Sequence, residues 1–173
     1  MVEFKRWPKI PRIENETYTV TEKIDGSNAC VVIDAEGNIG AQSRTQLIYP
    51  NDAEHKHQDN LGFAAWVAEH ADDLKKLGPG HHYGEWWGQK INRAYGLDHK
   101  RFSLFAWYTP DENMPECCYR VPVLSQSARY DELDTYIDFI KMGSCAAPGF
   151  LKPEGLVLRS NTNGGLFKVI IDK

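Results

Sequence analysis

The chain has 173 residues, of which 42% are hydrophobic and 25% are charged, and its formal net charge is −4. This is the composition of an ordinary globular protein, and the length predicts one domain over residues 1–173 with a core of its own. The negative charge excludes a protein that holds duplex nucleic acid mainly through a basic surface, so any nucleic-acid contact is expected to be local.

Cysteine usage and hydropathy indicate the compartment. The four cysteines lack the paired spacing of a metal site, and two of them are adjacent in sequence, so we expect reduced thiols at Cys30, Cys117, Cys118 and Cys145. A signal peptide and an apolar run that could cross a bilayer are both absent from these residues. We therefore expect a cytoplasmic protein without a membrane partner, from a bacterium, a phage-infected cell or another cell interior.

Residues 18–33 predict two strands around a charged turn. Residues 18–21 have the β-rich composition of a strand, and residues 29–33 predict a second, buried strand. Lys23 lies between them, and a lysine amine is a nucleophile only when it is neutral, which burial and nearby cations favour. The flanking Glu22 and Asp25 oppose this, so they need other partners or must point away. The pattern fits a solvated β-turn as well.

The middle of the chain predicts a hairpin, a helix and two further strands. Residues 34–38 predict a hairpin turn whose return strand leads to Arg44, and residues 61–77 predict one amphipathic helix that ends at a Gly-Pro-Gly sequence. Glu85 follows on an apolar strand, where it is costly to bury unless it is paired or bound to a cation; otherwise it faces outward from an edge strand. Phe105 lies on a strand over residues 101–108, as a base-stacking or a core residue. Between these strands, the polar segment offers three cations that could contact substrate phosphates, namely Arg93, Lys100 and Arg101.

The last third predicts a second helix and two strands with charged residues. Residues 128–142 form an amphipathic pattern that would bury Leu133, Tyr136, Ile137 and Ile140. Glu154 precedes Gly155, and a glycine there permits close approach of a ligand, while a carboxylate suits Mg²⁺. Lys168 follows on the final strand and would offset charge on a phosphate.

These segments, in this order, resemble the motifs of the covalent nucleotidyltransferases, namely the ATP-dependent DNA and RNA ligases and the mRNA capping enzymes. The resemblance is closest to the RNA ligase branch, and the ordered set is more specific than any one motif. The matching segments are Glu22 to Asn28 (motif I), Ser43-Arg44 (Ia), Tyr83 to Trp86 (III), Phe105 (IIIa), Glu154 to Val157 (IV) and Lys168 (V).

This resemblance implies an α+β nucleotidyltransferase (adenylation) domain, in which antiparallel sheets form a nucleotide cleft flanked by helices. It implies that Lys23 attacks the α-phosphorus of ATP to form lysyl-AMP, that AMP passes to a 5′-phosphate end, and that a 3′-hydroxyl then attacks that end, as in RNA repair. ATP, Mg²⁺ or Mn²⁺, and RNA or DNA ends are the expected cofactors and partners.

The resemblance also implies individual roles. Catalysis would involve Lys23, Glu154 and Lys168, and the metal would be bound by Glu154 and Glu85. Glu22 would accept a hydrogen bond from the adenine amino group and so select ATP over GTP. The nucleotide-binding set as a whole would be Glu22, Ile24, Asn28, Arg44, Glu85, Phe105, Glu154 and Lys168.

The sequence departs from the family pattern at two positions. Ala106 stands where an aspartate is common, and Ile170 stands where RNA ligases often carry a second lysine. We expect no C-terminal OB or other appended domain, which leaves a minimal ligase, a truncated chain or a separate protein that supplies end-binding. A DNA ligase or a guanylyltransferase on the same core is an alternative, and so is a non-catalytic module that binds nucleotides or nucleic-acid ends.

Overall fold

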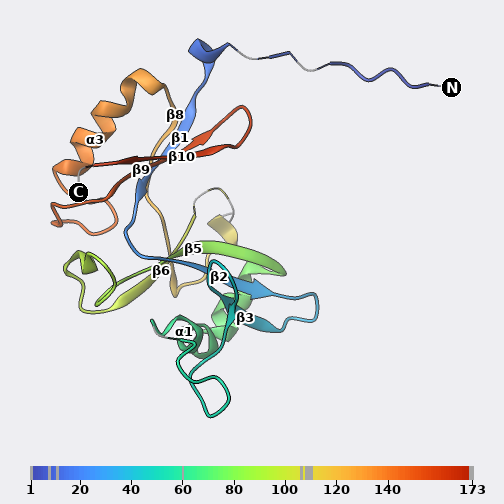
Figure 1. The fold of residues 1–173 in the computed structure, drawn as a ribbon, viewed down its shortest axis with the longest axis vertical. Coiled ribbons are helices and arrows are strands. Elements are labelled where there is room, and N and C mark those ends of the chain that lie inside the picture. The colour runs from blue at the N-terminus through green and yellow to red at the C-terminus, as the bar shows by residue number, and fades with distance from the viewer. Residues whose placement is uncertain are drawn as a thin grey trace.

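The computed structural model describes residues 2–7, 9–10, 12–59, 61–105, 107 and 111–171, with the backbone alone at position 111. It contains two sheets that lie one above the other in Figure 1. The smaller sheet is antiparallel and has the strand order β10-β9-β1-β8. Its strands are β1 (Tyr18–Lys23), β8 (Val123–Ala128), β9 (Gly155–Ser160) and β10 (Leu166–Ile170).

The larger sheet has the strand order β4-β3-β2-β5-β6-β7. Strands β6 and β7 pair in parallel, and the other neighbours are antiparallel. Its strands are β2 (Ser27–Ile33), β3 (Ile39–Gln42), β4 (Leu47–Ile48), β5 (Gly80–Gly88), β6 (Lys100–Leu104) and β7 (Cys118–Arg120). The α+β class expected from the sequence is confirmed.

Short helices cover the outer side of each sheet. Helices α1 (Phe63–Glu69) and α2 (Ala71–Leu74) pack on the larger sheet, and α3 (Leu133–Lys141) packs on the smaller one (Figure 1). Single 3₁₀ turns cover Ile13–Asn15, Lys75–Leu77, Ala94–Gly96, Asp111–Asn113 and Tyr130–Glu132. Among the residues that the structure describes, none of the helices has both the length and the apolar character that a membrane crossing needs.

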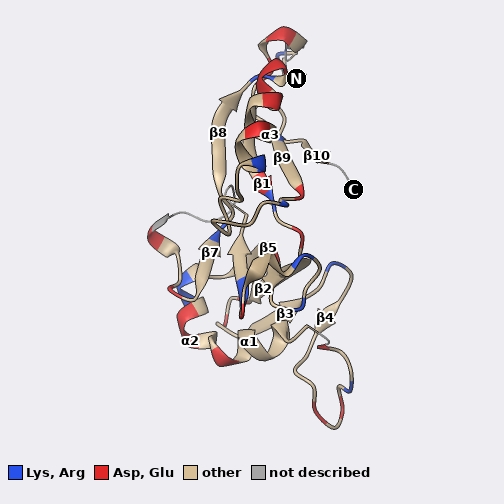
Figure 2. Cartoon of the chain, turned by 90° about the vertical axis from the view of Figure 1, so that its left-hand side faces the viewer, with Lys and Arg blue, Asp and Glu red and all other residues tan. Residues whose placement is uncertain are grey.

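The two predicted helices differ in accuracy. The single helix over residues 61–77 is wrong, because the chain leaves helical geometry at His70 (φ −103°, ψ 16°), where a ring nitrogen lies 2.9 Å from the Trp66 carbonyl oxygen. Helix α3 is amphipathic as predicted, but it begins at Leu133 and not at residue 128, which ends strand β8. Leu133 and Ile140 are buried, and Tyr136 and Ile137 are partly buried. Its opposite side carries the acidic residues visible in Figure 2.

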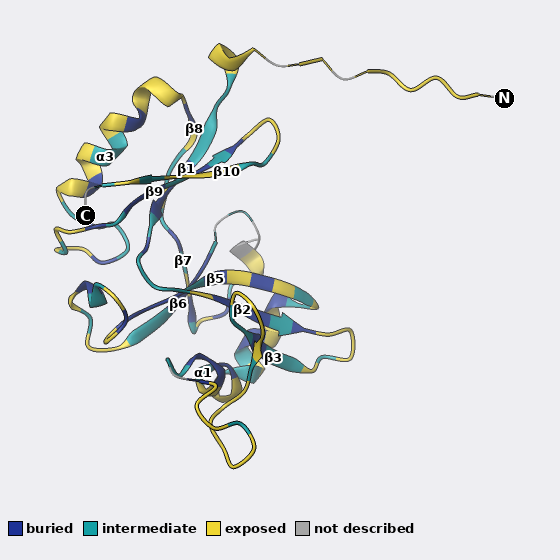
Figure 3. Cartoon of the chain, in the orientation of Figure 1, coloured by how far each residue is buried: buried dark blue, intermediate teal, exposed yellow. Residues whose placement is uncertain are grey.

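Three clusters of buried side chains stabilise this arrangement, and they form the dark segments in the middle of the sheets in Figure 3. One lies between the larger sheet and α1, and one lies between the smaller sheet and α3. The third, which we call the junction cluster, lies where the two sheets meet and consists of Ile24, Trp87, Tyr95, Val121 and Ala147. Each large apolar side chain buried this way contributes about 1.5–3 kcal/mol. The junction cluster therefore holds the sheets together beside Lys23.

Candidate active site

Lys23 lies at the point where the chain passes from one sheet to the other. It is the last residue of β1 in the smaller sheet, and a three-residue link leads to β2 in the larger sheet. The predicted strand–turn–strand is thus confirmed. The link needs its glycine, because a Cβ at Gly26 would lie 2.6 Å from the Trp86 carbonyl oxygen and 2.7 Å from the Trp87 Cβ.

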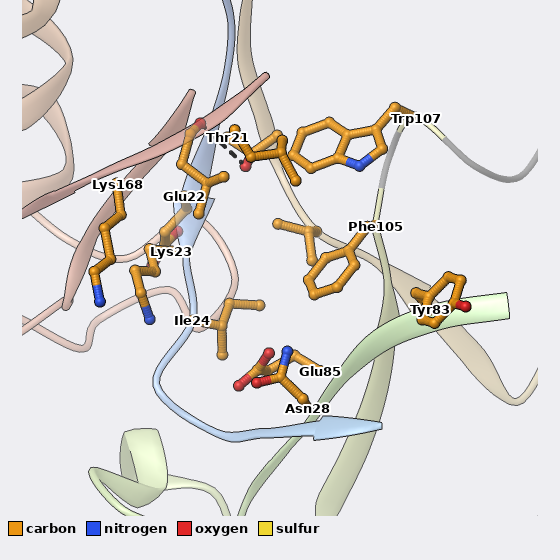
Figure 4. Close-up of a pocket in the computed structure, with 13 residues that line it drawn as sticks. Thr21, Glu22, Lys23, Ile24, Asn28, Tyr83, Glu85, Phe105, Trp107 and Lys168 are labelled. Carbon is orange, nitrogen blue, oxygen red and sulfur yellow. Dashed lines mark hydrogen bonds between the residues drawn. The ribbon is translucent and has the colours of Figure 1, made fainter. Parts of the chain in front are cut away.

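A cleft of about 430 Å³ opens between the two sheets beside this link (Figure 4). It brings together residues that are far apart in sequence, including most of the predicted nucleotide-binding set. The lining residues are Thr21, Glu22, Lys23, Ile24, Asn28, Tyr83, Glu85, Phe105, Trp107, Val121, Val157, Leu166 and Lys168.

Glu154 forms an ion pair with Lys23 at the end of this cleft. The Lys23 Nζ lies 2.7 Å from the Glu154 Oε2, and both side chains are mostly buried, with 23% and 17% of their surfaces exposed. Gly155 follows Glu154 and lies opposite Lys23 in the sheet register. A Cβ at Gly155 would collide with the carbonyl oxygen of Val169 on β10. The glycine is therefore required by strand packing, whether or not a ligand also approaches it.

Glu85 is the second carboxylate near the nucleophile. It lies on β5, opposite Asn28 of β2, and its Oε1 accepts a hydrogen bond of 3.1 Å from the Gly26 amide. Burial raises the pKa of Glu85 to about 7, although the Lys23 charge and the Gly26 amide act in the opposite direction. Glu85 is therefore a buried carboxyl group with one oxygen fixed by the motif I turn.

Replacing Glu85 by glutamine should make the folded protein more stable at pH 8. Its pKa rises from an ordinary 4.5 to about 7, so the native state binds the proton more tightly than the unfolded state. Stability then falls as pH rises from about 4.5 to about 7, by up to about 3 kcal/mol in total. Urea unfolding at pH 5 and pH 8 should show this fall in the parent and a smaller one in Glu85→Gln. Equal falls in both proteins would contradict the assignment.

Glu22 lines the cleft, but its carboxylate is bound by residues of the segment that follows α3. Its carboxylate accepts hydrogen bonds from the Ser144 hydroxyl (2.6 Å) and the amides of Cys145 (2.7 Å) and Ala146 (3.0 Å). The whole residue has 0% exposed surface. Both oxygens are engaged and covered in this structure, so an adenine amino group could reach the Glu22 carboxylate only if these hydrogen bonds were exchanged.

Asp25 is likewise directed away from the amine. Its Oδ2 lies 2.8 Å from the Arg93 Nε and its Oδ1 accepts a hydrogen bond of 2.9 Å from Asn92. Both acids that flank Lys23 therefore have other partners, as nucleophilic use of the amine requires. Arg93, which the sequence suggested as a contact for substrate phosphates, is paired with Asp25 in this structure. Lys100 instead donates to the Leu61 carbonyl oxygen at 2.7 Å.

An aromatic pair lines the opposite wall of the cleft. The rings of Phe105 and Trp107 are stacked, with centroids 6.2 Å apart and planes inclined by 19°. Sequence reasoning identified Phe105 and missed Trp107. The strand predicted over residues 101–108 is too long, because β6 ends at Leu104 and both aromatic residues follow it. The departure expected at Ala106 lies outside the described residues.

Arg44 lines a smaller hollow of about 120 Å³ that shares Asn28, Tyr83 and Phe105 with the main cleft.

Lys168 extends from β10 in the same direction as Lys23 (Figure 4). In the sheet register, Lys168 is aligned with Val157 and Thr21, two rows along from Lys23. Ile170 is aligned with Gly155 and Lys23. Many RNA ligases carry their second lysine at the position of Ile170, which therefore lies in the same row as the nucleophile Lys23. The cleft therefore contains one lysine from β10 where two were possible.

The arrangement of two sheets around a lysine-containing cleft matches solved structures of an RNA ligase from Naegleria gruberi. A mutant with ATP and Mn superposes with a TM-score of 0.60 at 20% identity, over 91% of this chain and 49% of that chain. A second mutant with ATP and Mn gives 0.58 at 18% identity over 92% and 51%, and the complex with PPi gives 0.57 at 20% over 91% and 50%. The chain thus spans about half the length of the solved structures it matches. No curated protein sequence matches it.

The fold of this chain is thus similar to that of solved RNA ligase structures. The model of the RNA ligase family matches residues 16–170, which include all the motif segments described above. The chain belongs to the RNA ligase family.

Proposed function

We propose that this chain is the adenylyltransferase domain of an ATP-dependent RNA ligase that joins 5′-phosphate and 3′-hydroxyl ends. The observation that carries the proposal is the position of Lys23, which lies in a cleft between two sheets, beside Glu154 and two rows from Lys168. A module that only binds nucleotides does not need a lysine held in this way.

In the proposed reaction, the neutral Lys23 amine attacks the α-phosphorus of ATP. A nitrogen–phosphorus bond forms, the bond to the β-phosphate oxygen breaks, and pyrophosphate leaves. Lys168, which extends beside Lys23, stabilises negative charge on the phosphate. AMP then passes from Lys23 to the 5′-phosphate of a nucleic-acid end. The 3′-hydroxyl of a second end attacks this phosphate, and AMP leaves.

The cleft walls suit the base and sugar of the nucleotide. Phe105 offers a face for the purine, and stacking of a base on such a ring contributes about 1–3 kcal/mol whatever the base. Ile24 lines the same space from the link. Asn28 and Glu85 provide polar groups on neighbouring strands for the ribose, and Arg44 is available from the adjoining hollow to a ribose or a nucleic-acid end.

Glu154 and Glu85 also fit a divalent cation. Mg²⁺ and Mn²⁺ bind carboxylate oxygens and commonly keep water and phosphate oxygens as their other ligands. Within the described ranges, no group of three or more His, Cys, Asp or Glu side chains could hold a metal ion, which agrees with a site that the nucleotide phosphates complete. When bound there, the metal would withdraw negative charge from the reacting phosphates.

Incubation with α-labelled ATP and Mg²⁺ or Mn²⁺, with GTP in parallel and denaturing electrophoresis afterwards, tests the proposal. We expect acid-labile label on the protein from ATP alone. Label from GTP alone would instead identify a guanylyltransferase. Ligation of RNA ends, with nicked DNA as the comparison, then tests the substrate and whether a separate end-binding protein is needed.

A non-catalytic binding module is the second candidate, and Ile170 in the row of Lys23 is the observation that favours it. An isoleucine there cannot offset phosphate charge. A folded protein that takes no label from either nucleotide would favour this candidate over the ligase.

A further inference from the structure

We propose that Arg93 is a positioning residue that aligns the nucleophile Lys23 with Glu154. This inference rests on the proposed function, because it concerns the geometry of that same site. Arg93 lies outside the motif segments, in the loop that follows β5. Its guanidinium contacts both the motif I segment and the residues directly before motif IV.

The first contact is with the motif I turn. The Arg93 Nε lies 2.8 Å from the Asp25 Oδ2, and Asp25 is two residues from Lys23. The pair is mostly buried, with 29% and 25% of the side chains exposed. Asn92, the neighbour of Arg93, donates to the Asp25 Oδ1 at 2.9 Å and to the Gly26 carbonyl oxygen at 2.7 Å. The loop thus holds the turn at three acceptor atoms.

The second contact is with the segment that carries Glu154. The Arg93 Nη1 donates to the carbonyl oxygen of Lys152 at 3.0 Å and lies 3.5 Å from that of Pro153. Glu154 is the next residue, and its carboxylate reaches Lys23 at 2.7 Å. A planar guanidinium can donate in two fixed directions, which a lysine ammonium at the same place cannot reproduce.

The backbone of the loop is unusual in a way that supports a functional constraint. Four non-glycine residues within six positions have positive φ, namely Lys90 (60°), Asn92 (43°), Ala94 (55°) and Tyr95 (52°). Such conformations persist where the surrounding structure enforces them, and they are concentrated at functional sites. Here the Tyr95 hydroxyl accepts a hydrogen bond of 2.8 Å from the Asp25 amide and adds a further connection to the turn.

These contacts explain how two residues separated by 131 positions keep a fixed distance. Lys23 is the last residue of β1, and Glu154 directly precedes β9. Without Arg93, only the pairing of these two strands would align the two side chains. Arg93 ties the turn after one to the chain before the other. Its loss should let the two reactive side chains move relative to each other while both sheets stay folded.

The test compares Arg93→Ala and Arg93→Lys with the parent. We expect Arg93→Ala to slow lysyl-AMP formation about 100-fold, the cost of a displacement near 1 Å, with a KM for ATP close to that of the parent. Arg93→Lys should be intermediate. Arg129→Ala is the matched control, because it removes an exposed Arg–Asp pair (3.3 Å to Asp131) at the far end of the smaller sheet. The Arg129→Ala variant should be labelled by ATP at the parental rate.

Hydrogen exchange provides a readout that does not need activity. Peptides covering residues 24–28 and 150–156 should exchange faster in Arg93→Ala, whereas peptides from α1 and α3 should be unchanged. Unchanged exchange in both active-site peptides would overturn the proposal, even if the parent itself took no label. A labelling rate equal to the parent's, or one reduced only in proportion to the folded fraction, would overturn it as well.

Discussion

Lys23→Ala should abolish covalent labelling by ATP. The substitution removes the only atom that this mechanism bonds to the α-phosphorus, so the loss should be complete and not graded. The ion pair with Glu154 is mostly buried, so its loss leaves the carboxylate without a partner and should also lower the free energy of unfolding, by up to about 3 kcal/mol. Denaturing electrophoresis after incubation with α-labelled ATP measures the label, and urea unfolding shows that the variant is folded.

Lys168→Ala is the matched control for this prediction. Lys168 lines the same cleft but forms no bond to phosphorus in the proposed reaction, so its loss should slow labelling without preventing it. Label that persists in Lys23→Ala would move the nucleophile to another residue. Label lost only in Lys168→Ala would have the same consequence.

Glu22→Ala should lower the free energy of unfolding by about 3 kcal/mol, because one buried and two partly buried donors lose their acceptor at once. These donors are the Ser144 hydroxyl and two amides of the following turn. Glu22→Gln should retain most of the stability. Its amide oxygen can face the two backbone N–H groups, and its NH₂ can donate to the Ser144 oxygen. Urea unfolding of both variants at pH 7 measures the difference.

The glutamine variant also separates a structural role from nucleotide selection. If Glu22 acts only by holding the turn after α3, Glu22→Gln should keep the parental preference for ATP over GTP. A relaxed preference in a stable Glu22→Gln would return the carboxylate to adenine recognition. Equal stability of Glu22→Ala and the parent would show that the three hydrogen bonds contribute nothing.

Local signals in the sequence predict the parts of the site that local structure determines. The strand–turn–strand around Lys23 follows from β-rich segments around a glycine, and Glu85 is placed by the strand that carries it. The long helix failed because the break at His70 depends on backbone geometry that periodicity does not report.

Partnerships across long sequence distances could not be predicted in the same way. Glu22 meets Ser144 over 122 positions and Asp25 meets Arg93 over 68, and neither pair has a spacing or composition that marks it. The sequence therefore indicated that both acids needed partners without indicating which. Gly155 shows the same limit, since its neighbour Val169 belongs to a strand whose pairing becomes known only from the fold.

The junction cluster has a consequence for inhibitor design. Lys23 belongs to the smaller sheet, whereas Glu85 and Asn28 belong to the larger one, so the reacting groups stay in register only while Ile24, Trp87 and their neighbours keep the sheets together. A compound that bound between these side chains would shift the two sheets relative to each other. It would thereby displace Lys23 from Glu85 and Asn28 and inactivate the nucleophile. Because Ile24 and Val121 also line the cleft, such a compound and ATP would compete for part of the same surface.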